Sequence, residues 1–199
     1  ADTPEMQQQA FDMTYDWVLF HKLVDVAKGK ANARDLGKLY TDPPRRYPAG
    51  SYRMTFTSNH DENSWNGTER ELYGDGADAM AVLAATLPGM PLVYSGQESA
   101  FDRRLKFFDK DQIDWGNYSR AGFYRRLLAL KKHHPSLTNS HEPGNLELIE
   151  TGNDKVFAFR RTAPGDKVRV VVNLSASPVK VTLPGNKGIS LKGWGWQID

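Results

Sequence analysis

An imidazole and a carboxylate follow one short stretch of alternating side chains. Within residues 52–57 apolar side chains alternate with polar ones, which is the period of two expected of a β-strand. His60 and Asp61 come just after this stretch, where a polar loop opens at Glu62. Residues at the carboxyl end of a strand are often functional in barrel folds. The pair is therefore the first candidate for binding and charge-stabilising chemistry.

A second strand of the same design follows further along the chain. Residues 89–95 form a brief apolar run that contains Gly89 and Pro91, and a carboxylate, Glu98, comes after it. Residues 77–87, between the two strands, place apolar side chains at the spacing of one helix face. A strand, a helix and a strand in this order predict a β-α-β unit.

Four segments together resemble the α-amylase family of glycoside hydrolases. Residues 56–61 and 89–98 are similar to the seventh and eighth strands of that family's barrel, and residues 11–17 are similar to its sixth strand. Residues 108–115 resemble the loop before the eighth helix. The four motifs occur in the family's order and cover nearly the whole chain, which makes them far more specific than an Asn-His-Asp triplet alone.

The resemblance implies an α/β fold in which residues 1–142 form the last three β/α units of a (β/α)8 (TIM) barrel. Asp16 is the expected N-terminal cap of a helix that reaches Ala27. A second helix is expected to end before Asp42, because prolines follow it. Residues 119–134 match the family's eighth helix.

After residues 143–144 the apolar period changes from 3.6 to 2, and this change predicts a domain boundary. Residues 143–199 are expected to form a small antiparallel β-sandwich domain. The predicted strands are residues 145–150, 156–162, 167–173, 179–183 and 189–197.

The resemblance also implies a reaction, the retaining hydrolysis of α-glucosidic bonds in starch- or maltodextrin-type glucans. Asp61 matches the family's third catalytic carboxylate, which stabilises an oxocarbenium-like transition state, and His60 matches a histidine that binds a sugar hydroxyl. The family's nucleophilic Asp and acid-base Glu follow strands four and five, which this chain lacks. We therefore expect the isolated chain to be inactive, and we expect no cofactor.

Other functions remain open on the residues alone. A transglycosylase or an α-glucosidase would use the same scaffold. A non-catalytic carbohydrate-binding or scaffold module would not require the barrel strands that carry the nucleophile and the acid. A structural reading makes Asp61 the cap of a turn and His60 a surface residue. Adjacent His and Asp residues also occur in metal-dependent phosphohydrolases, but the other histidines show no ligand spacing, so no metal site is predicted. Those histidines are His21, His133, His134 and His141.

Several further residues have weaker signals. Glu98 is equally consistent with a substrate contact and a structural role, and Asp12 and Tyr15 at the sixth strand are undecided. Asn59 is expected to order its loop. A basic run in a loop is expected to be a solvated surface, and two tryptophans near the C-terminus are expected to share one strand face and to pack on a neighbouring domain. These residues are Arg103, Arg104, Lys106, Trp194 and Trp196.

Composition limits the partners. The 199 residues carry 26 Lys and Arg against 24 Asp and Glu, and this net charge of +2 gives no field to attract nucleic acid or an anionic membrane. No apolar run is long enough to span a bilayer, and the absence of cysteine does not indicate a compartment. Besides an α-glucan substrate, we expect a homodimer through the exposed barrel strands in preference to the alternative, a monomer in which loops cover these strands and the C-terminal sandwich supplies most of the core. Its expected apolar face comprises Phe11, Met13, Met54, Phe56, Leu92 and Val93.

Overall fold

Three short parallel strands form one sheet in the computed structural model, which describes residues 3–43, 46–139, 145–185 and 187–199. The strands β1 (Met13–Tyr15), β2 (Tyr52–Thr55) and β3 (Met90–Pro91) lie side by side in that order. Both pairings are parallel, and a helix connects β2 to β3. This arrangement confirms the predicted β-α-β unit.

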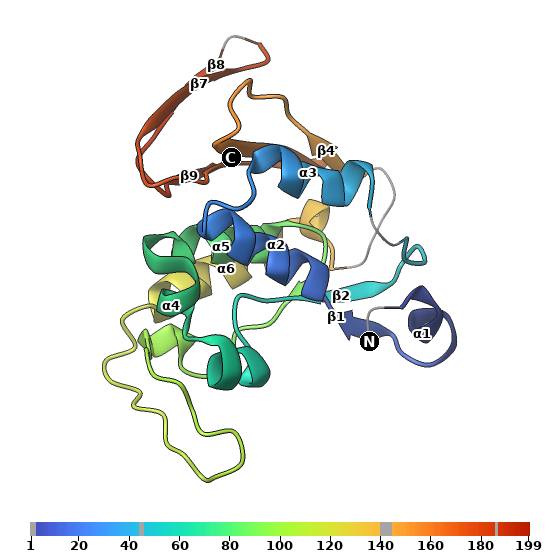
Figure 1. Ribbon diagram of the computed structural model, residues 1–199. Coiled ribbons are helices and arrows are strands. Elements are labelled where there is room, and N and C mark those ends of the chain that lie inside the picture. The colour runs from blue at the N-terminus through green and yellow to red at the C-terminus, as the bar shows by residue number, and fades with distance from the viewer. Residues whose placement is uncertain (1–2, 44–45, 140–144, 186) are drawn as a thin grey trace.

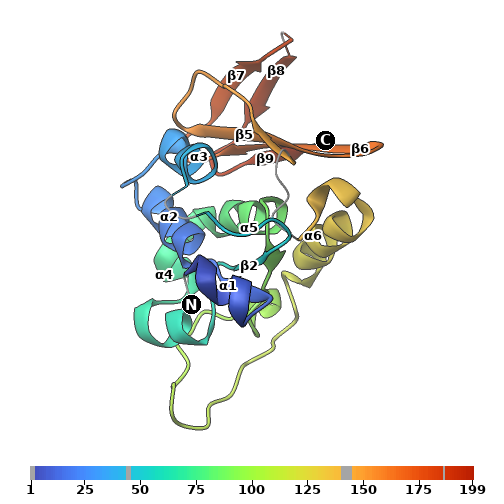
Figure 2. The same ribbon diagram turned by 90° about the vertical axis from the view of Figure 1, so that its right-hand side faces the viewer.

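Helices pack between this sheet and the antiparallel strands that follow (Figures 1 and 2). As predicted, the Asp16 side chain caps a helix by accepting a hydrogen bond from the backbone N–H of Leu19 at 3.1 Å. None of the described helices is both long and apolar enough to cross a membrane. The α-helices are α1 (Pro4–Gln9), α2 (Trp17–Ala27), α3 (Ala33–Thr41), α4 (Glu69–Tyr73), α5 (Ala77–Thr86) and α6 (Ala121–His133). Short 3-10 turns are η2 (Gly74–Gly76), η3 (Gln97–Ser99) and η4 (Pro135–Leu137), and η1 (Glu62–Asn66) is a π-helical turn.

The C-terminal part contains a four-stranded antiparallel sheet in the order β4-β5-β6-β9 and a separate β7-β8 hairpin. Alternate side chains of β5 and β6 point to opposite faces. Phe157 and Phe159 face the helices, whereas Val156 and Ala158 pack against the hairpin. The sheet is therefore buried on both faces. The strands are β4 (Leu146–Leu148), β5 (Val156–Ala163), β6 (Asp166–Asn173), β7 (Val179–Leu183), β8 (Lys187–Leu191) and β9 (Trp196–Ile198).

The predicted strand over residues 189–197 is wrong, because the chain turns after Leu191. A Cβ atom on Gly193 would lie 2.0 Å from the carbonyl oxygen of Ala176, so only glycine fits this close approach. Trp194 has a positive φ of 52°, which no strand residue adopts. The segment is therefore divided into β8 and β9, and the two predicted tryptophans do not share one strand face.

Both tryptophans nevertheless pack against the helical part. A Cβ atom on Gly76 would lie 3.0 Å from the Trp194 ring, and the Trp196 ring lies 5.9 Å from that of Phe123 on α6. One hydrophobic core draws residues from both sides of the predicted boundary at residues 142–143. The boundary lies outside the described residues, and the division into two domains stays a prediction.

The apolar face expected to be exposed is wrong at Phe56. Its side chain is 1% exposed and stacks on Phe20 of α2 with ring centroids 4.8 Å apart. This side of the strand is covered by helix α2, which the alternating pattern could not reveal. Phe11, beside β1, is 52% exposed, whereas Leu92 and Val93 are partly buried and pack against the core.

We expect the chain to associate through β1 and β3, the outer strands of the described parallel sheet, because outer strands leave backbone groups to pair. Sedimentation over a wide dilution range tests this expectation. Phe11→Ser should shift the population towards monomer, and Phe108→Ser, at an exposed phenylalanine in a distant loop, should not. A monomer at every concentration would contradict the dimer.

Candidate functional site

His60 and Asp61 lie together at the carboxyl-end edge of the parallel sheet. They begin the helical turn that follows β2. The His60 and Asp61 side chains are 56% and 43% exposed, and His60 Nε2 lies 3.6 Å from the Asp61 carboxylate. The fold therefore holds the predicted pair side by side and open to solvent, where a ligand can reach both groups.

Asn59 orders the turn that carries the pair, as predicted. It is 1% exposed, and its Oδ1 atom accepts a hydrogen bond from the backbone N–H of Glu62 at 2.8 Å. The π-helical turn η1 closes where the N–H of Gly67 donates to the carbonyl of Glu62 at 2.8 Å. A Cβ atom on Gly67, whose φ is 150°, would lie 3.1 Å from the Cβ of Glu71. π-Helical turns are rare and occur frequently at functional sites.

The Asp61 carboxylate does not serve the fold in the way that the structural reading predicts. Its side chain makes no capping hydrogen bond to η1, because Asn59 already supplies the acceptor. Capping of the turn therefore does not account for a carboxylate at this position. Asp61 stays available to interact with a ligand at the edge of the sheet.

A network of polar side chains surrounds the segment that follows β2. Thr57 donates a hydrogen bond to Glu69 at 2.5 Å and accepts one from Gln97 at 2.9 Å. Arg120 pairs with the other oxygen of Glu69 at 2.6 Å and with Asp78 at 2.5 Å. These bonds join the segment that follows β2 to α4, η3 and α5 and to Arg120, which precedes α6. Partly buried charged groups in such a network hold one geometry, which fixes the backbone that presents His60 and Asp61.

The basic residues Arg103, Arg104 and Lys106 are exposed, as predicted, and the two arginines also form ion pairs. Arg104 binds Glu71 through two hydrogen bonds of 2.9 and 3.1 Å, and Arg103 binds Asp111 through two of 2.8 and 3.0 Å. Hydrogen bonds from Arg103 hold the pKa of the Asp111 carboxyl well below its usual range. Lys106 is mostly exposed, as expected for the run. The two arginines therefore shape the long loop beside the site.

The weaker candidates separate by position. The Glu98 carboxylate accepts a hydrogen bond from the N–H of Gly96 at 2.9 Å, which supports its structural reading. Asp12 precedes β1 and is exposed, so it lies at the opposite end of the strand from His60 and Asp61. Tyr15 ends β1 and packs edge-on against Phe56 at 5.5 Å. The structure thus places Asp12 at the other end of the sheet and gives Glu98 a structural hydrogen bond.

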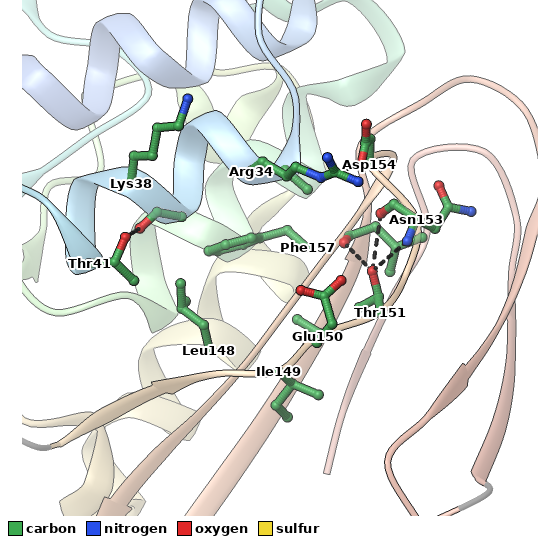
Figure 3. Close-up of a pocket in the computed structure, with 14 residues that line it drawn as sticks. Arg34, Lys38, Thr41, Leu148, Ile149, Glu150, Thr151, Asn153, Asp154 and Phe157 are labelled. Atoms are coloured by element: carbon green, nitrogen blue, oxygen red, sulfur yellow. Dashed lines mark hydrogen bonds and ion pairs between the residues drawn. The ribbon is translucent and has the colours of Figure 1, made fainter.

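The described residues include no group of three or more His, Asp or Glu side chains placed to hold a metal ion. A cavity of about 300 Å³ lies elsewhere, between α3 and the turn that joins β4 to β5 (Figure 3). Arg34 and Asp154 form an ion pair of 2.7 Å at its edge, and Thr151 bonds to backbone carbonyls. Neither His60 nor Asp61 lines this cavity, so it is separate from the candidate site.

The chain is similar to a family model, to curated proteins and to solved structures. Residues 146–197 match the family model of the maltogenic amylase C-terminal domain. The alpha-amylase MalA of Haloarcula japonica is 29% identical over 194 residues, which are 94% of this chain and 28% of that protein. The alpha-1,4-glucan:maltose-1-phosphate maltosyltransferase 2 of Streptomyces coelicolor is 31% identical over 112 residues, 49% of this chain and 16% of that protein.

A solved structure shows the same fold. The cyclic α-maltosyl-(1→6)-maltose hydrolase of Arthrobacter globiformis, in complex with its named sugar, superposes with a TM-score of 0.78 at 17% identity. The superposition covers 100% of this chain and 47% of that one. The chain therefore spans about half of the solved structure and less than a third of the two curated relatives.

Proposed function

We propose that this chain is the C-terminal part of a retaining enzyme that acts on α-glucosidic bonds of starch- or maltodextrin-type glucans, and its similarity to a maltogenic amylase C-terminal domain and to an alpha-amylase supports this. The observation that carries the proposal is the Asp61 carboxylate, which lies beside His60 at the edge of the sheet and caps nothing. In this proposal the three parallel strands are part of the last three β/α units of a (β/α)8 barrel, and the C-terminal strands β4 to β9 form a β-sandwich domain that packs on the barrel.

The roles within the site follow from the chemistry of glycoside cleavage. A nucleophilic carboxylate attacks the anomeric carbon while an acid protonates the departing oxygen, and water later cleaves the glycosyl-enzyme bond. Positive charge develops on the sugar ring between these states. Asp61 stabilises that charge by holding ring hydroxyls, and His60 donates a hydrogen bond to a hydroxyl of the same sugar. The nucleophile and the acid come from barrel strands outside this chain.

Glycosyl transfer is the second candidate function, because one of the similar proteins is named as a maltosyltransferase. Hydrolysis and transfer share the glycosyl-enzyme intermediate and differ in whether water or a sugar hydroxyl attacks it. Incubating the intact enzyme with maltotriose distinguishes them. Products longer than the substrate indicate transfer, and glucose and maltose alone indicate hydrolysis.

The isolated 199-residue chain should show no turnover of an activated aryl α-glucoside. A single charge-stabilising carboxylate supplies neither the nucleophile nor the proton donor that the retaining reaction requires. Release of the aryl group, measured against an Asp61→Ala control, tests this. Turnover by the wild-type chain that disappears in the control would place a complete catalytic set within these residues and would contradict the proposal.

A further inference from the structure

Three exposed aromatic side chains gather next to His60. Phe107 is the centre of the group: its ring lies 6.0 Å from that of His60 in a stacked arrangement, 5.3 Å from that of Trp65 and 4.9 Å from that of Phe108. Trp65, Phe107 and Phe108 are 56%, 38% and 85% exposed. Contiguous exposed apolar groups of this kind mark interaction sites, because leaving them in water is unfavourable.

The aromatic group is held in place by its two supporting segments. Trp65 lies on η1, whereas Phe107 and Phe108 lie on the loop that leads to α6. Asn63 of η1 accepts a hydrogen bond from the N–H of Leu105 at 2.8 Å, and its amide donates to the carbonyl of Arg103 at 3.2 Å. Figures 1 and 2 show this loop projecting at the end of the molecule away from the antiparallel strands.

The ion pairs described above strengthen the same connection. Arg104, while bound to Glu71, also donates to the carbonyls of Trp65 and Asn66 at 3.4 and 3.3 Å. The backbone that carries Trp65 is thereby joined to the loop that carries the two phenylalanines. A preformed surface loses little conformational entropy when a ligand binds. The aromatic group thus has the rigidity of a binding surface as well as its exposure.

The chemistry of the neighbours identifies the occupant. A pyranose ring has C–H bonds on its faces and hydroxyls around its rim, so it suits an aromatic surface that adjoins hydrogen-bonding groups. His60 and Asp61 supply such groups at one end of the aromatic surface. A glucan bound at Asp61 extends beyond one sugar unit. Its next unit has the aromatic side chains within reach, because Phe107 stacks on His60.

We propose that Trp65, Phe107 and Phe108 form a stacking platform for a glucosyl unit adjacent to the one held by His60 and Asp61. The assignment rests on the proposed function, since it takes its substrate class from that site. The platform adds affinity for oligosaccharides of several units and has no part in bond cleavage. It therefore sets the preference for long over short substrates.

Titration of the chain with maltoheptaose, followed by tryptophan fluorescence and calorimetry, tests the platform. Trp65→Ala and Phe108→Ala should each weaken binding about 5-fold or more, because each removes an aromatic contact. Trp65→Phe should retain most of the affinity. Trp115→Ala is the matched control, because Trp115 is a 39% exposed tryptophan of the same loop that stacks on Tyr118 instead.

Each outcome bears on the platform. Circular dichroism and the denaturation midpoint must match wild type, and Phe108→Ala meets this condition because an 85% exposed side chain contributes little to the core. No binding of maltoheptaose by the wild-type chain up to the sugar's solubility limit would overturn the proposal. Equal losses of affinity in Phe108→Ala and Trp115→Ala would also overturn it. So would affinity that is unchanged in both Trp65→Ala and Phe108→Ala.

Assays of the intact enzyme separate this proposal from the proposed function. Phe108→Ala should raise KM for maltoheptaose more than KM for an aryl α-glucoside, since the short substrate does not reach the platform. If Asp61→Asn leaves kcat unchanged but Phe108→Ala still weakens maltoheptaose binding, the platform stands and the catalytic role of Asp61 fails. If Asp61→Asn lowers kcat but Phe108→Ala leaves maltoheptaose binding unchanged, the catalytic role of Asp61 stands and the platform fails.

Discussion

Asp61→Asn should lower kcat of the intact enzyme by about 10³-fold or more, with little change in KM. The substitution keeps the size and shape of the side chain but removes the negative charge that stabilises the developing oxocarbenium ion. The stability of the fold should not change, because the carboxylate is 43% exposed and makes no capping hydrogen bond. Steady-state kinetics on maltoheptaose and a thermal melt of the same sample measure both effects.

The matched control is Asp75→Asn, which changes an exposed carboxylate in the nearby turn η2. It should leave both kcat and the melting temperature near wild type. His60→Ala should have a milder effect than Asp61→Asn, because it removes one hydrogen bond to a sugar hydroxyl. If Asp61→Asn keeps more than about a tenth of the wild-type kcat, the catalytic role is wrong. A large loss of stability in Asp61→Asn would restore a structural role.

Arg161→Ala should lower the free energy of unfolding by about 3 kcal/mol or more. Arg161 is fully buried on β5 and donates to the carbonyls of Thr86 at 3.0 Å and Thr138 at 3.2 Å, and to the side chain of Asn145. These bonds connect the antiparallel sheet to the end of α5, which precedes β3. Alanine would leave a cavity and remove three hydrogen bonds at once.

An opposing effect is smaller. Burial lowers the pKa of Arg161 to about 10, so removing the buried charge relieves a cost on the order of 3 kcal/mol. Buried acceptors that lose their donor cost about 1–3 kcal/mol each, and truncation of a large buried side chain costs about 3–5 kcal/mol. The sum of the losses exceeds the gain, and the net effect is destabilising.

Urea denaturation of Arg161→Ala and Arg160→Ala provides the comparison. Arg160 is next in sequence but lies on the opposite face of β5, where it forms a half-exposed ion pair of 2.9 Å with Glu147. Its replacement should cost less than about 1 kcal/mol. Arg161→Met restores much of the volume without the donors, and it should fall between the two. Equal stability of the two alanine variants would show that the buried bonds contribute nothing net.

The amino-acid sequence by itself determined the local elements. The apolar periods predicted α2, α5 and the strands β5, β6 and β7 to within a few residues, because helix and strand repeats differ in the residues that share a face. The family resemblance predicted α6. Asp16 and Asn59 act as the sequence predicts, since a side chain that bonds to backbone two or three residues away needs no tertiary partner. The parallel strands then bring their carboxyl ends to one edge, which is why His60 and Asp61 could be selected.

Only the tertiary structure decided which faces are covered and which distant residues meet. A strand pattern shows that Phe56 and its neighbours alternate, but the position of α2 decides that Phe56 is buried. The close approach of Gly193 to Ala176 divides one predicted strand into two. Trp65 and Phe107 have no shared periodicity in the sequence, and hydrogen bonds between η1 and a distant loop bring them together beside His60. Contacts between residues far apart in the chain depend on packing, which local spacing does not encode.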